Sequence, residues 1–190
     1  VALAGIIGDD TSGRQLRRLL DKSQIQDLAY VSKNTTTICK TRMISHNQQM
    51  LRADFEGNFC ISEIDTLTSM CEEHLKNVDI VLLSDYNKGT LEECQRLMSS
   101  ANRLNIKVIV DPKGDDFNRY RGAYLLTPNV SEFENIVGKC VDEQDMFEKA
   151  KTLIRQLDLH ALLLTRSEQG MTLFFQDGKH HHFNTRAREV

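Results

Sequence analysis

Residues 123–138 read AYLLTPNVSEFENIVG, and they contain the strand-to-helix step that decides the fold. Apolar residues run into a Thr-Pro-Asn turn, and a pattern with helical spacing begins directly after it. Asn129 and Glu132 therefore lie together at the corner, where the first helical turn has unpaired backbone N–H groups. Asn129, Ser131 or Glu132 could simply cap the helix. Alternatively, Asn129 and Glu132 could form half of a magnesium–phosphate site.

The same alternation of strand and helix patterns recurs along the chain. Strands are predicted at 2–8, 79–85, 107–111, 123–127 and 160–165. Helices are predicted after a Thr11 cap, after capping boxes at Thr90–Glu93 and Ser131–Glu134, and over the apolar stripe at 146–157. Continuous apolar strands separated by amphipathic helices are typical of an α/β fold, with a mainly parallel sheet and helices on both faces.

Two segments break this alternation. Residues 35–56, TTTICKTRMISHNQQMLRADFE, are polar and β-branched, and they are predicted to form strands outside the main sheet. MTLFFQDGKHHHFN is predicted to be a hairpin around Asp177-Gly178. Adjacent residues in a strand point to opposite faces, so only His180 and His182 can share one. A plain hairpin strand is therefore favoured over a metal site.

Composition narrows the class of protein. The 190 residues are enough for one domain or most of one, and the net charge of −3 argues against nucleic-acid binding. No apolar run reaches the roughly 18 residues of a membrane span. The five cysteines are odd in number and have no C-x-x-C spacing, which is typical of reduced thiols in a cytosolic protein. The start on Val1 in mid-strand and the end on TRAREV indicate a fragment of a longer polypeptide.

Polar residues at the predicted strand ends indicate a phosphorylated ligand, because ligands of open α/β sheets bind beyond the carboxyl ends of the strands. Lys88 and Lys113 each precede a glycine, and Arg166 follows another strand. These three cations are candidate phosphate contacts. No Walker loop, G-x-S-x-G or G-x-G-x-x-G motif is present, which argues against the classical P-loop, hydrolase and dinucleotide classes.

Five motifs, found in family order over nearly all of the chain, resemble the ribokinase-like sugar kinases. The likeness is to the kinase domain of the heptose 7-phosphate kinase/heptose 1-phosphate adenylyltransferases. The motifs are TRMISHNQQMLRADFE, LSDYNKGTL, VIVDPKGDDFNRYRGA, LLTPNVSEFENIVG and LLLTRSEQGMTLF. The Asn-x-x-Glu motif of the family, associated with ATP and its magnesium, falls on Asn129, Val130, Ser131 and Glu132.

This resemblance implies a cytoplasmic kinase that uses ATP and Mg²⁺. Its reaction would be phosphorylation of D-glycero-β-D-manno-heptose 7-phosphate at C1, in ADP-heptose synthesis for lipopolysaccharide core. Asn129 and Glu132 would hold the metal, and Arg166 would contact ATP. Residues 35–56 would be a small β lid that pairs with its twin in a homodimer. The candidate sugar-phosphate contacts are Arg42, Arg52, Lys88 and Lys113.

The resemblance also identifies what residues 1–190 do not contain. Family members carry a Gly-Gly sugar-binding stretch upstream, and downstream a Gly-Ala-Gly-Asp motif whose aspartate is the catalytic base. Neither motif is in this sequence, nor is an adenylyltransferase domain. The 190 residues are therefore expected to be a partial kinase domain that is inactive by itself. Two alternatives stay open: a kinase for another phosphosugar, and a nucleotide-binding or structural piece without turnover.

Overall fold

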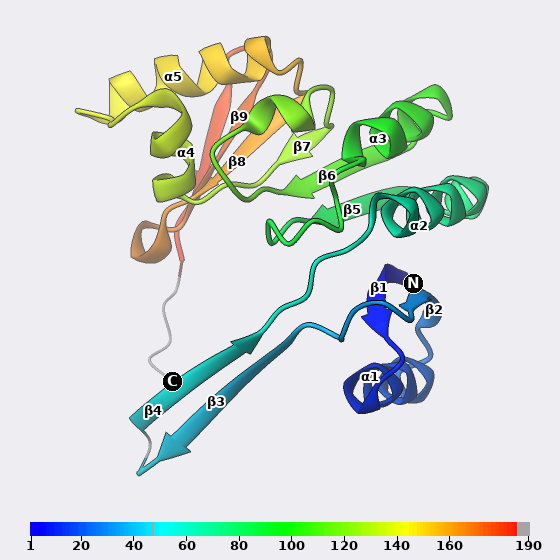
Figure 1. Cartoon of the computed structure of the whole chain (residues 1–190). Coiled ribbons are helices and arrows are strands. Elements are labelled where there is room, and N and C mark those ends of the chain that lie inside the picture. The colour runs from blue at the N-terminus through cyan, green and yellow to red at the C-terminus, as the bar shows by residue number, and fades with distance from the viewer. Residues whose placement is uncertain (47, 186–190) are drawn as a thin grey trace. The chain divides into compact units, whose positions relative to one another are not determined.

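A computed structural model describes residues 1–46 and 48–185, and the chain divides into two compact units. The first unit contains Val1–Glu73 and Lys88–Glu93, and the second contains His74–Asn87 and Cys94–Val190. Figure 1 labels the α-helices and most of the strands of both units. No helix among the described residues is long and apolar enough to cross a bilayer.

The first unit pairs β1 (Ala2–Gly8) with β2 (Gln26–Ser32) in parallel, with α1 (Thr11–Lys22) between them. The Thr11 cap is a wrong prediction. Asp10 is the N-cap, because its carboxylate accepts hydrogen bonds from Gly13 N at 2.7 Å and from Thr37 N at 2.7 Å. These bonds hold the pKa of Asp10 below its usual value. The sequence patterns also missed β2 and α2 (Ile61–His74), which packs Ile64 and Leu67 against Ile6.

The segment that breaks the alternation forms a separate two-stranded antiparallel sheet, as predicted. It consists of β3 (Cys39–Ser45) and β4 (Gln48–Phe55), and we call this hairpin the lid. Arg42 lies directly opposite Arg52, and the register shifts between Met43 and Ile44. Figure 1 shows the two long strands of the lid side by side.

The second unit is built on a six-stranded sheet in the order β10-β9-β8-β7-β6-β5. Its parallel strands are β5 (Ile80–Ser84), β6 (Lys107–Asp111), β7 (Leu125–Leu126) and β8 (Ala161–Thr165). The hairpin of β9 (Met171–Phe175) and β10 (His180–Phe183) turns at Asp177-Gly178, as predicted. This arrangement confirms the α/β fold with a mainly parallel sheet.

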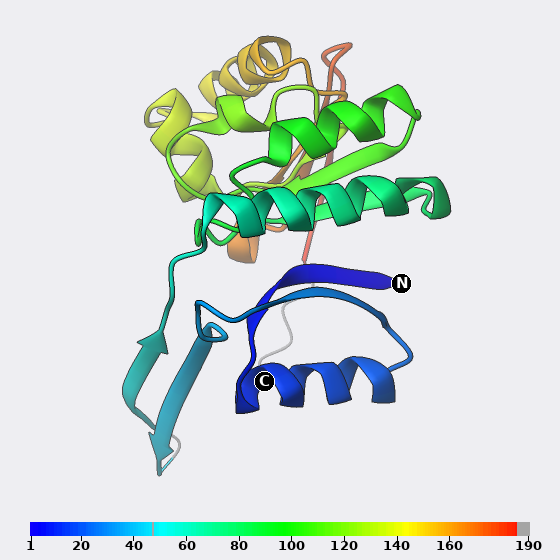
Figure 2. The same cartoon turned by 45° about the vertical axis from the view of Figure 1, so that its right-hand side comes forward.

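Three helices lie on one side of this sheet, as Figures 1 and 2 show together. They are α3 (Cys94–Arg103), α4 (Val130–Val137) and α5 (Glu143–Gln156). The short 3-10 helices are η1 (Leu75–Asn77), η2 (Phe117–Tyr120) and η3 (Ser167–Gln169). The core beneath the helices is fully buried, with no exposure at Val108, Val110, Leu126, Phe133, Leu162 and Leu164.

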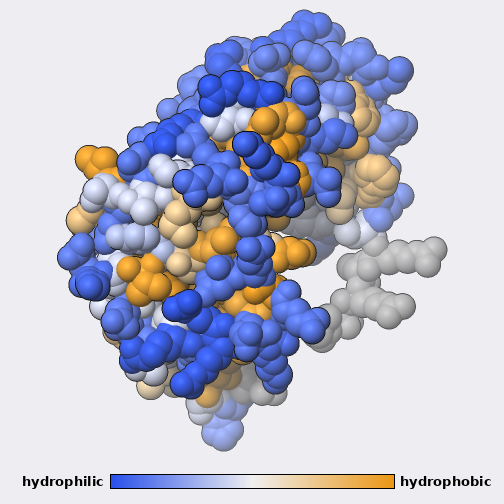
Figure 3. Space-filling view, turned by 90° about the vertical axis from the view of Figure 1, so that its right-hand side faces the viewer, coloured by the Kyte–Doolittle hydropathy of each residue, from blue (hydrophilic) through white to orange (hydrophobic). Residues whose placement is uncertain are grey.

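Several predicted boundaries are wrong. The helix expected after Thr90 begins only at Cys94, because residues 90–93 form turns that follow Gly89, whose φ is +90°. Only two residues of 123–127 form strand β7. The strands at 2–8 and 79–85 are not buried throughout, since Leu3 is 45% and Leu82 is 65% exposed. Hydrophobic patches lie among hydrophilic side chains on the surface drawn in Figure 3.

Candidate functional site

Asn129 is the N-cap of α4 and forms a capping box with Glu132. The Asn129 Oδ1 accepts a hydrogen bond from Glu132 N at 2.9 Å, and Glu132 Oε2 accepts one from Asn129 N at 3.1 Å. The capping box predicted for Ser131 and Glu134 is therefore wrong. Ser131 already lies within the first helical turn, because the helix starts at Val130.

The corner that carries Asn129 is held against the end of β8. Thr165 N donates a hydrogen bond to Pro128 O at 3.0 Å, and Asn129 and Thr165 form an isolated parallel bridge. The Asn129 backbone is thus fixed by its sheet neighbour as well as by its helix. This fixes the starting point of the amide side chain and of the first turn of α4.

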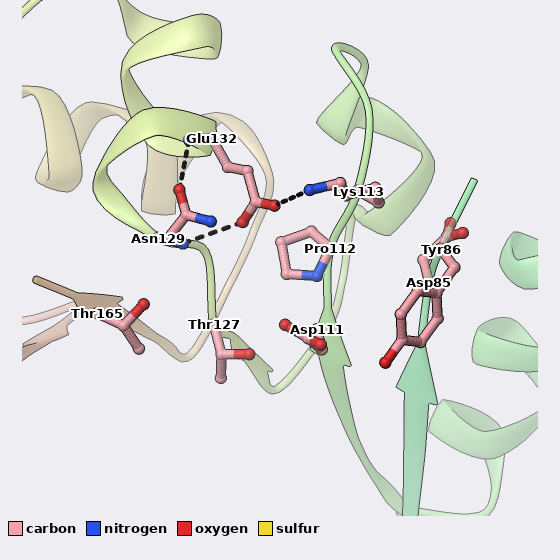
Figure 4. Close-up of a pocket in the computed structure, with 9 residues that line it drawn as sticks. All are labelled: Asp85, Tyr86, Asp111, Pro112, Lys113, Thr127, Asn129, Glu132 and Thr165. Atoms are coloured by element: carbon pink, nitrogen blue, oxygen red, sulfur yellow. Dashed lines mark hydrogen bonds and ion pairs between the residues drawn. The ribbon is translucent and has the colours of Figure 1, made fainter. Parts of the chain in front are cut away.

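Lys113 neutralises the second oxygen of Glu132. Its Nζ lies 2.7 Å from Glu132 Oε1, and this hydrogen bond raises the pKa of Lys113. Lys113 is half exposed, whereas the Glu132 side chain is only 13% exposed. Figure 4 shows both Glu132 contacts, to Asn129 on its own helix and to Lys113 on the loop after β6. The pair therefore joins two strand-end loops, and both carboxylate oxygens are engaged.

A cavity of about 320 Å³ lies in front of this pair. It is lined at the carboxyl ends of β5, β6, β7 and β8 by Asp85, Tyr86, Asp111, Pro112, Lys113, Thr127, Asn129, Glu132 and Thr165. Burial, and then the negative charge of Glu132, raise the pKa of Asp111. A buried carboxyl group whose charge is disfavoured by a neighbouring carboxylate, beside an amide oxygen, fits a hard cation such as Mg²⁺.

The sequence motifs alone do not assign Asp85 or Asp111 to the site. Both are the polar residues that end apolar strands, in SDY and VDPKG. That position was the available signal, because ligands of parallel sheets bind at the carboxyl ends of strands. Asn129, Glu132 and Lys113, which the sequence did single out, are brought together.

A model of the family described as pfkB family carbohydrate kinase matches residues 1–190. This chain belongs to the pfkB family. It is 47% identical over 191 residues to the bifunctional protein HldE of Haemophilus influenzae Rd, and 48% identical to that of Pasteurella multocida Pm70. Both alignments cover 100% of this chain and 40% of the relative, so the chain spans less than half the length of these relatives.

Solved structures share the fold of this pfkB-family chain. Phosphofructokinase-2 of Escherichia coli in complex with fructose-6-phosphate has a TM-score of 0.78 at 17% identity, over 100% of this chain and 64% of its own. Ribokinase of Giardia lamblia has a TM-score of 0.77 at 14% identity, over 100% of this chain and 61% of its own. The ribokinase-like fold is thereby established, together with its small antiparallel β pair.

Arg166 of the pfkB-family chain lies in a different cavity of about 350 Å³. Its guanidinium donates to Glu143 at the start of α5 and to Gln169, and its Nε is buried without a partner among the described residues. The cavity is lined by Glu143, Phe147, Arg166, Gln169, Thr172, His180 and His182. In the described part of the chain, no three His, Cys, Asp or Glu side chains could hold a metal ion together.

The other candidate cations belong to the first unit. Lys88 Nζ lies 2.6 Å from Glu56 Oε1, and Arg52 lies 2.9 Å from Asp54. Arg42 and Arg52 are cross-strand partners in the lid, so two like charges face each other on one surface of the hairpin. Like charges directly opposite each other are destabilising, and the Asp54 carboxylate offsets part of that repulsion at Arg52.

Proposed function

We propose that the full-length protein carrying this chain transfers the γ-phosphoryl group of ATP to the C1 hydroxyl of D-glycero-β-D-manno-heptose 7-phosphate. The product is the 1,7-bisphosphate, and the reaction belongs to cytoplasmic ADP-heptose synthesis for lipopolysaccharide core. One observation carries this proposal: the Asn129–Glu132 corner, with Asp111 and Lys113 beside it, in a pfkB-family chain resembling the heptose 7-phosphate kinases.

The residues of the cavity suit phosphoryl transfer, in which positioning and charge neutralisation do most of the work. Asn129, Glu132 and Asp111 would hold Mg²⁺, which neutralises phosphate oxygens when bound. Lys113 would turn from Glu132 toward a phosphate oxygen. The backbone N–H groups of Val130 and Ser131, in the first turn of α4, would face the same charge. Arg166 stays a proposed ATP contact on the neighbouring loop.

The lid would contribute to the sugar site. Arg42 and Arg52 face each other across its two strands, and a phosphate group between them would relieve their repulsion. The 7-phosphate of the heptose is such a group. Lys88, which contacts Glu56 just after β4, would be an additional phosphosugar contact.

Arg42→Ala should raise the KM for heptose 7-phosphate about tenfold, on the scale of one charge-assisted hydrogen bond, with little change in kcat. Steady-state kinetics of the full-length enzyme measures both constants. Arg18→Ala is the matched control, because it removes the same charge from an exposed position on α1 in the same unit. An unchanged KM in Arg42→Ala would contradict the phosphate role.

The opposite surface of the lid is apolar and suits a second copy of the chain. The cross-strand pairs Met43–Leu51 and Cys39–Phe55 lie on that surface, and Met43, Leu51 and Phe55 are 59%, 54% and 58% exposed. Exposed apolar surface of this kind marks interaction sites. The proposed homodimer would bury it.

Leu51→Asp should convert this dimer into a monomer, because a carboxylate would be buried without a partner in the contact. Light scattering coupled to gel filtration measures the mass of the full-length protein. Leu19→Asp is the control, because it places the same carboxylate at an exposed position of α1, and it should leave the mass unchanged. A dimer that survives Leu51→Asp would exclude the lid as the contact.

ADP release by the full-length protein with a panel of sugars tests the proposed reaction. Heptose 7-phosphate should give the highest kcat/KM, compared with fructose 6-phosphate and ribose, and no rate should be seen without Mg²⁺. A preference for fructose 6-phosphate would favour a kinase for another phosphosugar. ATP binding without turnover of any sugar would favour a non-catalytic nucleotide-binding protein.

A further inference from the structure

Tyr120, at the end of η2, connects two of the loops that line the cavity. Its side chain is fully buried, with 0% exposure. The hydroxyl donates to Asp85 Oδ2 at 2.7 Å, beyond the end of β5, and accepts a hydrogen bond from Lys113 N at 3.3 Å, beyond the end of β6. The Lys113 carbonyl also lies 3.1 Å from the hydroxyl. The phenolic O–H donates to Asp85 Oδ2, which is the closer of the two acceptors.

Asp85 is itself fixed, so it can serve as the anchor. Its Oδ1 accepts a hydrogen bond from Asn87 N at 2.7 Å, its backbone N donates to Asp111 O at 2.9 Å, and Arg119 lies 3.7 Å from Oδ2. Burial, followed by the hydrogen bond to Asp85, raises the pKa of Tyr120. The hydroxyl therefore keeps its proton, and the connection from Asp85 to Lys113 persists at neutral pH.

Filling the core does not require this hydroxyl. Phe117, on the same turn, is 1% exposed and packs edge-on to Tyr120 with ring centroids 5.8 Å apart. A second phenylalanine at position 120 would occupy nearly the same volume. The hydroxyl adds only polar contacts, to Asp85 and to Lys113. Both of these residues line the cavity that also includes Glu132.

We propose that Tyr120 is a positioning residue that holds the Lys113 backbone against Asp85, and thereby keeps Lys113 in reach of Glu132 and of the nucleotide phosphates. This inference rests on the proposed function. It predicts that Tyr120 affects nucleotide affinity through Lys113 rather than through the stability of the fold.

A double-mutant cycle in the full-length protein tests this, with the Kd for MgATP measured by calorimetry. Tyr120→Phe and Lys113→Met should each weaken binding, Lys113→Met by about tenfold and Tyr120→Phe by somewhat less, on the scale of a hydrogen bond to a charged group. The double variant should bind no more weakly than Lys113→Met alone, within about twofold, because both changes remove one coupled contact. Tyr124→Phe is the control, since it deletes a partly exposed tyrosine hydroxyl on the neighbouring segment.

Additive losses in the double variant would overturn the inference, as would an unchanged Kd in Tyr120→Phe. If Tyr120→Phe lowers Tm so far that it does not fold, Asp85→Asn replaces it in the cycle, because it removes the charge of the anchor and keeps its size. Heptose-dependent turnover of the wild type is measured in parallel. MgATP binding without that turnover would refute the proposed sugar reaction and leave the Tyr120 test intact.

Discussion

Glu132→Gln should lower the proposed magnesium-dependent turnover of the full-length protein by at least about tenfold, or roughly 1.4 kcal/mol of transition-state stabilisation. Glutamine keeps the side-chain oxygen that accepts the Asn129 N–H, so the capping box and the start of α4 survive. The charge that faces Lys113 and the proposed metal is lost. The measurement is kcat/KM at a series of Mg²⁺ concentrations, and half-maximal activity should require more Mg²⁺.

The same variant should change the pH dependence in a defined direction. Asp111 has a raised pKa, first because of burial and then because of the Glu132 charge. Removing that charge lowers the pKa of Asp111, so the acid limb of the magnesium-dependent activity should move to lower pH. Glu134→Gln, a neighbouring acid on α4 outside the cavity, should change neither rate nor profile. Wild-type rate and magnesium dependence in Glu132→Gln would refute the metal role.

The sequence located the Asn129–Glu132 corner but could not choose between a helix cap and a ligand site. Both readings use the same side-chain oxygens at the same helix N-terminus, and the structure shows the capping box directly. The spacing of residues in the sequence does not show which side chains surround Glu132, whereas the folded structure does. Lys113 reaches Glu132 from 19 positions away, and Asp111 faces the same cavity. Those contacts depend on the order of parallel strands, which no local pattern encodes.

Arg166 illustrates the opposite case. Its place after β8 resembles that of the other strand-end cations, but its side chain is held by Glu143, 23 positions earlier, in a separate cavity.

Two elements, β2 and α2, are missed by the sequence patterns because their buried and exposed residues do not alternate clearly. β2 has few buried residues, and α2 has little contrast between its faces, because Glu63 is buried in it beside Ile64. The Glu63 carboxylate is satisfied there by Ser32 Oγ at 2.5 Å, a partner that periodicity cannot reveal.

The 190-residue chain expressed by itself should show no heptose kinase activity, a loss of at least about 10³-fold relative to the full-length protein, since a general base alone contributes about 10²–10⁴. The resemblance to ribokinase-like sugar kinases assigns the base to a Gly-Ala-Gly-Asp motif, and no aspartate of this sequence has that context. Asp85 is committed to Tyr120 and Asn87 in the structure. The glycine amides of the motif, which would stabilise the transferring charge, are missing as well.

The assay for this prediction is ADP release with heptose 7-phosphate and Mg²⁺, chain against full-length protein. Circular dichroism and MgATP calorimetry on the same samples separate a folded, nucleotide-binding chain from an unfolded one. The full-length protein with the motif aspartate changed to asparagine is the matched control, and it should lose activity to a similar extent while keeping MgATP binding. Comparable turnover by the chain and the full-length protein would place the base within these 190 residues. Asp111, the other carboxylate of the cavity that ends a strand, would then be the first to replace.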